Sequence, residues 1–278
     1  MTNPYLLELP AVVSFSGGRT SGYMLRKILD AHGGQPQDLE VCFQNTGLEH
    51  PATYEFVREV AERWGVCITW LEYCVDDKGD HDFREVDFDT ASRDGGPFSA
   101  LVQKKGYLPT PVARICTTNL KMRTLDRYLQ TLTTHQDGYT NAVGLRYDEP
   151  RRALRIKADN GREDVVVPLY QAKATEEDVL TFWKEQDFDL NLPLTGNMAG
   201  NCVGCFLKGR GKLEHLMVEM PEHFEWWAKA EILMQGVAKK PYFREDRPRY
   251  ASMLDTARTQ GQLFPTNGED TVPCMCTD

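Results

Sequence analysis

The sequence predicts an α/β protein with a parallel sheet covered by helices. Short apolar runs typical of strands alternate with segments of helical periodicity through the front half of the chain, and this alternation indicates βαβ units. The first strand, expected at 10–15, runs directly into a turn of small residues, and a helical segment containing Tyr23 follows. Ligands bind to such sheets beyond the carboxyl ends of the strands. We therefore expect the functional site at that edge of the sheet.

The other elements follow from the same patterns. Further strands are expected at 39–44, 66–71 and 141–145, with a short apolar run at 165–169. Helices are expected at 51–64, 97–105 and 213–235. The acidic residues after Thr175 suit the first turn of another helix, with Thr175 as its N-cap. We expect loops through most of 76–111 and irregular structure over 241–278.

Composition and charge limit the class of protein. The chain has 278 residues, of which 41% are hydrophobic, and this is enough for one large domain with an appendage. We expect a sheet-bearing part at 1–172 and a helical, cysteine-bearing part at 173–278. The formal net charge of −9 argues against nucleic-acid binding through bulk charge. We see no secretory signal or membrane span, and expect a cytoplasmic protein whose cysteines are thiols or metal ligands.

The turn after the first strand has the composition of a phosphate-binding loop. It reads Ser16-Gly17-Gly18-Arg19-Thr20-Ser21. The two glycines let backbone N–H groups approach an anion, and the new helix adds free N–H groups and the positive end of its dipole. Hydroxyl groups and the Arg19 cation can add to this. The spacing differs from that of the Walker loop, and the alternative is an ordinary turn rich in small residues.

Two more polar segments are expected at strand ends on the same edge. They are Asn45-Thr46-Gly47 and Arg146-Tyr147-Asp148-Glu149, the latter followed by Arg152. Arginine can clamp a phosphate or sulfate with two parallel hydrogen bonds. The alternative for the second segment is a solvated charge cluster that neutralises itself. Lys121 likewise has two interpretations: it contacts a phosphate, or it is an ordinary solvent-exposed surface lysine.

The cysteines form a further group. Cys202-Val203-Gly204-Cys205 places two thiols in a glycine-containing turn, a spacing that suits one metal centre. Cys116 lies upstream, and Cys274 and Cys276 lie near the end of the chain. Thiolates favour zinc or iron–sulfur clusters. A redox dithiol, or cysteines with no joint role, are the alternatives.

Taken in chain order, these segments resemble the phosphoadenosine phosphosulfate reductase family, within the PP-loop adenine-nucleotide α-hydrolase fold. The similar segments are Ser16–Ser21 (the family's SGGxDS, with Thr20 in place of Asp), Asn45–Gly47, Arg114-Ile115-Cys116 with Leu120-Lys121, Gly144–Glu149 with Arg152, Pro168-Leu169 with Thr175–Val179, and Cys202–Cys205. The resemblance covers roughly residues 10–210, and its strength lies in the order of so many motifs.

The resemblance implies a HUP-like nucleotide-binding domain that takes ATP or an adenylyl sulfate, with Mg²⁺ accompanying ATP. The implied nucleotide-binding residues are Ser16, Gly17, Gly18, Arg19, Thr20, Ser21, Asn45, Thr46, Gly47, Gly144, Arg146, Asp148 and Arg152. Lys121, Arg146 and Arg19 are implied to stabilise charge during the reaction. A 4Fe-4S cluster, with zinc as the alternative, is implied on Cys116, Cys202, Cys205 and either Cys274 or Cys276.

Three departures from the family pattern shape the functional hypothesis. First, only one cysteine stands at Ile115-Cys116, where iron–sulfur reductases of the family carry two. Second, the sequence ends without the Glu-Cys-Gly-Leu-His motif of the reductases. Third, the Ser-Gly-Gly turn is closer to that of the ATP-cleaving members. We therefore expect an enzyme that adenylates an acceptor with ATP in support of sulfur transfer. Expected partners include a sulfur-donor protein, a nucleic-acid acceptor and a second copy of the chain. The alternatives are a sulfonucleotide reductase using Cys274 or Cys276, and a non-catalytic nucleotide- and cluster-binding subunit.

Overall fold

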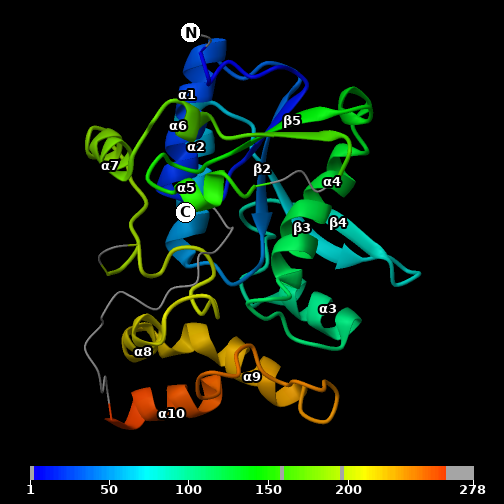
Figure 1. Ribbon diagram of the computed structural model, residues 1–278, viewed down its shortest axis with the longest axis vertical. Coiled ribbons are helices and arrows are strands. Elements are labelled where there is room, and N and C mark those ends of the chain that lie inside the picture. Colours follow the sequence, from blue (N-terminus) through cyan, green and yellow to red (C-terminus); the bar gives the residue numbers. More distant parts are fainter. Residues whose placement is uncertain (1–2, 157–159, 195–196, 261–278) are drawn as a thin grey trace.

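A six-stranded sheet forms the centre of the protein, as the computed structural model of residues 3–156, 160–194 and 197–260 shows (Figure 1). The strands are β1 (Ala11–Ser14), β2 (Leu39–Asn45), β3 (Thr69–Val75), β4 (His81–Val86), β5 (Tyr139–Val143) and β6 (Glu163–Val166). Their order is β4-β3-β2-β1-β5-β6, and every pairing except the antiparallel β3–β4 pair is parallel. The α/β fold class expected from the sequence is confirmed.

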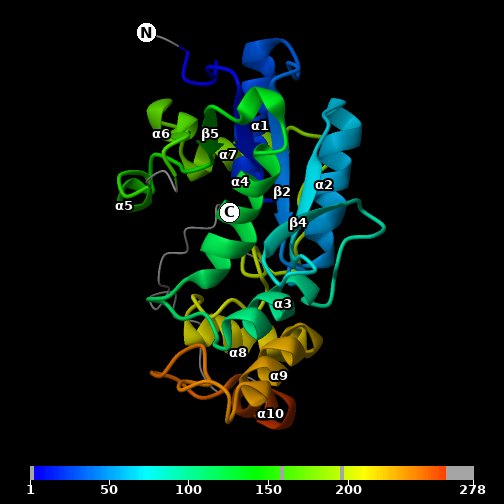
Figure 2. The ribbon, with the colours of Figure 1, turned by 90° about the vertical axis from the view of Figure 1, so that its right-hand side faces the viewer.

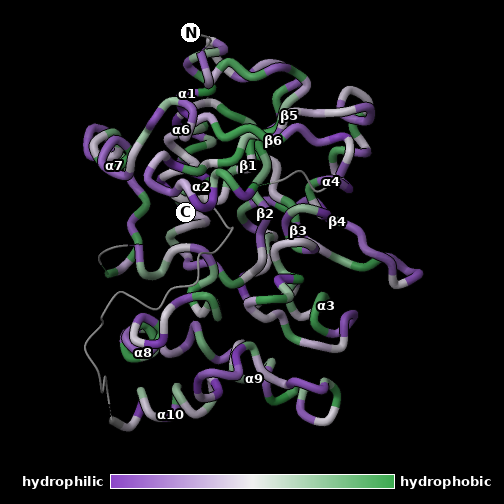
Figure 3. The backbone as a smooth tube through the Cα atoms, in the orientation of Figure 1, coloured by the Kyte–Doolittle hydropathy of each residue, from purple (hydrophilic) through white to green (hydrophobic). Residues whose placement is uncertain are grey.

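Helices cover both faces of the sheet because successive side chains of a strand point to opposite faces. Val13 and Val41 are fully buried in one core, with α1 (Arg19–His32) and α2 (Pro51–Trp64). Their neighbours on β1 and β2 are buried in a second core, with α4 (Thr124–Leu129). Figure 2 shows α2 and α4 on opposite sides of β2. The central strands are the most continuously hydrophobic part of the chain, whereas the β3–β4 connection is hydrophilic (Figure 3).

The shorter helices complete the chain between and after the strands. They are α3 (Gly96–Lys105), the π-helix η1 (Thr117–Arg123), the 3-10 helix η2 (Thr133–His135), α5 (Pro150–Ala153), α6 (Pro168–Gln171) and α7 (Glu176–Lys184). Thr175 caps α7 in a capping box with Asp178, as its position in the sequence predicts. Among the helices that the structure describes, none has the length and hydrophobicity needed to cross a bilayer.

Three expectations about the elements are wrong. The loop expected over most of 76–111 contains β4. The single helix expected at 213–235 is three: α8 (Arg210–Glu219), the 3-10 helix η3 (Pro221–Phe224) and α9 (Glu225–Leu233). Pro221 lacks the N–H that would continue α8.

The region expected to be irregular after 241 contains a further helix, α10 (Tyr250–Gln260). Tyr250, Met253 and Leu254 are buried in a third core with residues of α8 and α9. These three helices lie together as a layer below the sheet in Figure 1. Residues of α3 belong to the same core, so the helical layer packs against the lower edge of the sheet-bearing part.

Candidate functional site

The turn between β1 and α1 is held in shape by its own backbone and hydroxyl groups. Gly17 has a left-handed conformation with φ of +75°, and Gly18 is the extended N-cap of α1. Ser21 ties the turn together, because its Oγ accepts from the Ser16 N–H at 3.2 Å and donates to the Gly18 carbonyl at 3.0 Å. The Ser21 hydroxyl is thus committed to the turn.

Several amide groups of this turn have no backbone acceptor in the described part of the chain. Among the described residues, the N–H groups of Gly17, Gly18, Arg19 and Thr20 donate no backbone hydrogen bond. Free N–H groups at the start of a helix are the donors that bind phosphate in proteins. Of these four residues, Gly17 and Gly18 border a small hollow, which is lined by Ser16, Gly17, Gly18, Thr53, Leu190, Asn197, Gly200 and Asn201. We call it the turn hollow.

Arg19 contacts a carboxylate instead of facing the turn hollow with a free cation. Its Nε and Nη2 donate to the two oxygens of Asp189 at 2.7 and 2.8 Å, and Nη2 also donates to the Leu190 carbonyl. The Arg19 carbonyl in turn accepts from the indole N–H of Trp183 at 2.8 Å. Arg19 therefore ties the start of α1 to the segment around α7. Its charge is already neutralised by Asp189.

The end of β5 packs directly on the turn. A Cβ atom added to Gly144 would lie 3.3 Å from the Ser21 Cα, so glycine permits this close approach. Arg146 then donates from Nη1 to the Thr20 hydroxyl at 3.0 Å and from Nε to Asp148 at 3.0 Å. The structure thus brings two of the three segments expected at the sheet edge into contact, the turn at 16–21 and the segment at 146–149.

Arg146 stays charged in this setting. Burial by itself would lower the pKa of Arg146, but the carboxylates of Glu149 and Asp148 outweigh burial and raise it. Glu149 also pairs with Arg152. Asp148 accepts from the backbone N–H of Glu176 at 3.1 Å, which fixes the cluster to the first turn of α7. Arg146 is therefore a held cation beside the turn, with only 12% of its side chain exposed.

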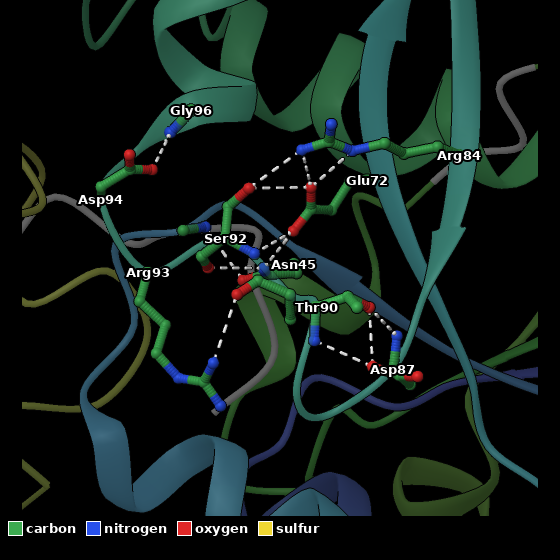
Figure 4. A network of polar contacts seen from close by, with 11 residues as sticks. Asn45, Glu72, Arg84, Asp87, Thr90, Ser92, Arg93, Asp94 and Gly96 are labelled. Carbon is green, nitrogen blue, oxygen red and sulfur yellow. Dashed lines mark hydrogen bonds and ion pairs between the residues drawn. The ribbon is translucent and has the colours of Figure 1, made fainter.

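Asn45 is part of a buried polar network and does not border the turn hollow (Figure 4). Its Nδ2 donates to Glu72 at 2.7 Å and to the Ser92 carbonyl at 2.8 Å, and its Oδ1 accepts from the Gly47 N–H. Glu72 is fully buried and also accepts from Arg84. Asn45 and Gly47 thus shape the end of β2. The sequence offered no sign of this, because Glu72 sits within an apolar strand.

The second hollow gathers the upstream cysteine and the Cys202–Cys205 pair. It is lined by Thr46, Phe98, Cys116, Thr117, Lys121, Asn201, Cys202, Cys205, Phe206, Leu207 and Trp227. We call it the cysteine hollow. Within the described ranges, no three His, Cys, Asp or Glu side chains are already arranged to bind one metal ion. Cys274 and Cys276 lie outside those ranges.

The strand β2 positions Cys202. Glu49 and Cys202 form an antiparallel bridge, and the N–H of Val203 donates to the Leu48 carbonyl at 2.9 Å. The Thr46 hydroxyl donates to Glu49 at 2.7 Å and lies 3.3 Å from the Cys202 Sγ. Thr46 is therefore placed beside a thiol, whereas the sequence suggested a contact with nucleotide.

The carbonyl groups of the cysteine loop are held by two cations and a phenol. Lys208 Nζ donates to the carbonyls of Gly200, Cys202 and Val203 at 2.9–3.0 Å. Arg247 donates to the carbonyls of Phe206 and Lys208, and the Tyr250 hydroxyl donates to that of Gly204 at 2.7 Å. The helix α10, missed in the sequence, thus supports this loop. The buried indole Nε1 of Trp227 packs against Gly204 and has no hydrogen-bond partner in the part of the chain that the structure describes.

The π-helix explains how Lys121 reaches the cysteine hollow. Hydrogen bonds in a π-helix join residues five apart, whereas an α-helix has 3.6 residues per turn. Cys116 and Lys121, five positions apart, therefore lie on the same side of η1, and both line the cysteine hollow. Lys121 does not line the turn hollow. Asn201, which the sequence did not single out, borders both hollows, so the two hollows are adjacent.

Comparison with known proteins finds two relatives. No family model matches the chain. The chain is 34% identical over 210 residues to the uncharacterized nin region protein ORF290 of Escherichia phage lambda, an alignment that covers 73% of this chain and 67% of the relative. It is 22% identical over 250 residues to the uncharacterized protein MJ0066 of Methanocaldococcus jannaschii, covering 86% of this chain and 46% of that relative. Neither name states an activity.

Proposed function

The chain belongs to the family of the nin region protein ORF290 of phage lambda, and we propose that it is an adenine-nucleotide-binding enzyme that adenylates an acceptor with ATP in support of sulfur transfer. The observation that carries this proposal is the turn between β1 and α1. The amide N–H groups of Gly17, Gly18, Arg19 and Thr20 donate no backbone hydrogen bond among the described residues, and free N–H groups at the start of a helix suit an anion. The held cation Arg146 lies against the same turn through Thr20.

The proposed reaction has two steps. An acceptor oxygen attacks the α-phosphorus of ATP, and pyrophosphate departs as the acceptor–AMP bond forms. A sulfur nucleophile then displaces AMP from the acceptor. Charge on the departing pyrophosphate needs fixed donors, and preorganised N–H groups and cations supply the largest part of such stabilisation. The amides of Gly17 and Gly18 and the guanidinium of Arg146 are the groups that this chain offers.

The cysteine hollow fits a thiolate-bound metal centre by its donor set. Cys116, Cys202 and Cys205 line it together, and thiolates suit zinc or an iron–sulfur cluster. Among the residues with described structure, the buried Trp227 N–H beside Gly204 lacks an acceptor, as expected next to a site that receives an electron-rich group. When bound, such a centre would supply a redox-active or sulfur-carrying group next to the nucleotide. Cys274 and Cys276 are the candidates for a fourth ligand.

A turnover screen of anaerobically purified protein tests the proposal. The protein is incubated with ATP and Mg²⁺, and separately with each adenylyl sulfate and thioredoxin. Release of pyrophosphate from ATP is the expected result. Release of sulfite instead would favour the second candidate, a sulfonucleotide reductase. The observation in favour of that candidate is that Lys121 lines the same hollow as three cysteines. Binding of nucleotide without either product would reduce the protein to a binding subunit.

A further inference from the structure

A buried carboxylate on α9 is bonded to two backbone N–H groups. Glu231 is only 3% exposed. Its Oε1 accepts from the N–H of Phe243 at 3.2 Å, and its Oε2 accepts from the N–H of Tyr250 at 2.8 Å. Burial raises the pKa of Glu231, although the two N–H groups act in the opposite direction. A carboxylate is costly to bury and is rarely found in a core without a specific partner.

The two N–H groups stand at the two ends of one segment, residues 243–250, which we call the strap. Tyr250 begins α10, and the described backbone of 243–249 is neither helix nor strand. The strap therefore lacks the regular hydrogen bonds that would fix its course. Because Glu231 accepts from both ends, a single carboxylate sets where the strap lies relative to α9.

The strap carries two of the groups that hold the cysteine loop, residues 200–208. Arg247 donates to two carbonyls that follow Cys205 in the chain, at 2.7 and 2.9 Å. The Tyr250 hydroxyl donates at 2.7 Å to the carbonyl of Gly204, which lies between the two cysteines of this loop. A shift of the strap would therefore move three carbonyls of the cysteine loop. The hydrogen bonds form a continuous connection from Glu231 to the loop.

We propose that Glu231 is a positioning residue that holds the Cys202–Cys205 loop in the geometry that binds a metal ion. The inference rests on the metal centre of the proposed function and adds a residue that does not line the cysteine hollow. Groups behind the ligands of a metal site orient those ligands, and their loss typically weakens metal binding 10- to 100-fold. Loss of the Glu231 carboxylate should therefore weaken metal binding while every thiol is still present.

Two variants interrupt the connection at different points. Glu231→Gln keeps the shape of the side chain, but its single acceptor oxygen leaves one of the two N–H groups without an acceptor. Tyr250→Phe removes the hydroxyl that reaches the Gly204 carbonyl. Glu225→Gln is the matched control, because Glu225 also lies on α9 and also contacts α10, through Arg258 at 3.2 Å. Its side chain is 47% exposed.

Hydrogen exchange of the full-length chain, followed by mass spectrometry of its peptides, reports on the loop itself. We expect amides of the cysteine loop to exchange about tenfold faster in Glu231→Gln, the factor for one charge-assisted hydrogen bond. Amides of β1 and α1 should exchange as in the unaltered protein, and Glu225→Gln should change neither region. Unchanged exchange of the loop in Glu231→Gln would overturn the proposal. Equally faster exchange in the loop and in α1 would show a general loss of stability and also overturn it.

Cobalt binding to the metal-free protein, followed by the thiolate-to-cobalt absorption band, reports on the site. We expect Kd for Co²⁺ to rise about tenfold in Glu231→Gln and in Tyr250→Phe. The double variant should lose no more than either single variant, because both act through one connection. Unchanged Kd in Glu231→Gln, or losses that multiply in the double variant, would overturn the positioning role. If the unaltered protein binds no Co²⁺, the metal centre of the proposed function is wrong, and the exchange rates still decide whether Glu231 holds the loop.

Discussion

Gly17 is the residue of the turn between β1 and α1 that its surroundings constrain most tightly. Replacing it with alanine forces a side-chain-bearing residue to a φ of +75°, which costs roughly 1–2 kcal/mol. The new Cβ would also lie 2.7 Å from Thr53 Cγ2, 3.1 Å from Val57 Cγ2 and 3.2 Å from Phe43 Cε2. Overpacking of this kind costs roughly a further 1–3 kcal/mol. We expect Gly17→Ala to lower the free energy of unfolding in urea by about 2–5 kcal/mol.

Gly65 provides the matched control. It has a φ of +61° and no atom within 4 Å of an added Cβ, so Gly65→Ala should cost only the roughly 1–2 kcal/mol of backbone strain. Adding Thr53→Ser to Gly17→Ala removes the nearest methyl group and should restore part of the difference. Equal losses for Gly17→Ala and Gly65→Ala, with no recovery in the double variant, would refute the packing argument.

The remaining predictions concern binding, metal content and pH. Gly18 is extended at φ of −104°, so Gly18→Val should keep the fold and abolish nucleotide binding; unchanged ATP affinity in calorimetry would contradict the phosphate cradle. Anaerobic protein should contain iron and acid-labile sulfide, and Cys202→Ser should remove both; a colourless protein with stoichiometric zinc would exclude the cluster. Burial, and then the positive charge of Arg123, lowers the pKa of His81 from its usual 6.5 to about 4. Because this folded-state pKa is depressed, stability should fall by about 1–2 kcal/mol between pH 6.5 and 4 after allowance for solvent screening. The free energy of unfolding in urea should therefore depend less on pH between 6.5 and 4 in His81→Gln than in the unaltered protein. The same pH dependence in both proteins would refute the role of His81.

The turn between β1 and α1 could be predicted because everything that makes it is local. A buried strand, two glycines and the first turn of a helix stand within eleven positions of one another in the sequence. The strands β1 and β2 follow from their apolar residues for the same reason. The strand β4 could not be found in this way. Four of its six residues are polar and none is buried, and it forms by antiparallel pairing with β3 at the sheet edge.

The partners of individual charges depend on contacts far apart in the chain. Arg19 has the charge and the position in sequence of a phosphate ligand, but it pairs with Asp189 in the folded protein. This pair forms only after α7 packs on α1, so the sequence does not reveal it. Lys121 joins the cysteine hollow because η1 is a π-helix, a form that sequence periodicity does not reveal. The break in the helix expected at 213–235 was visible in principle, because Pro221 stands in its middle.

Asn201 has a consequence for any reactive intermediate made in this protein. It borders the turn hollow on one side and the cysteine hollow on the other, and Cys202 follows it directly. If the proposed adenylation takes place at the turn, the adenylated acceptor would form next to the hollow that Cys116, Cys202 and Cys205 line. Over so short a path, transfer could outrun hydrolysis by bulk water, and an unstable intermediate would not need to leave the protein between the two steps.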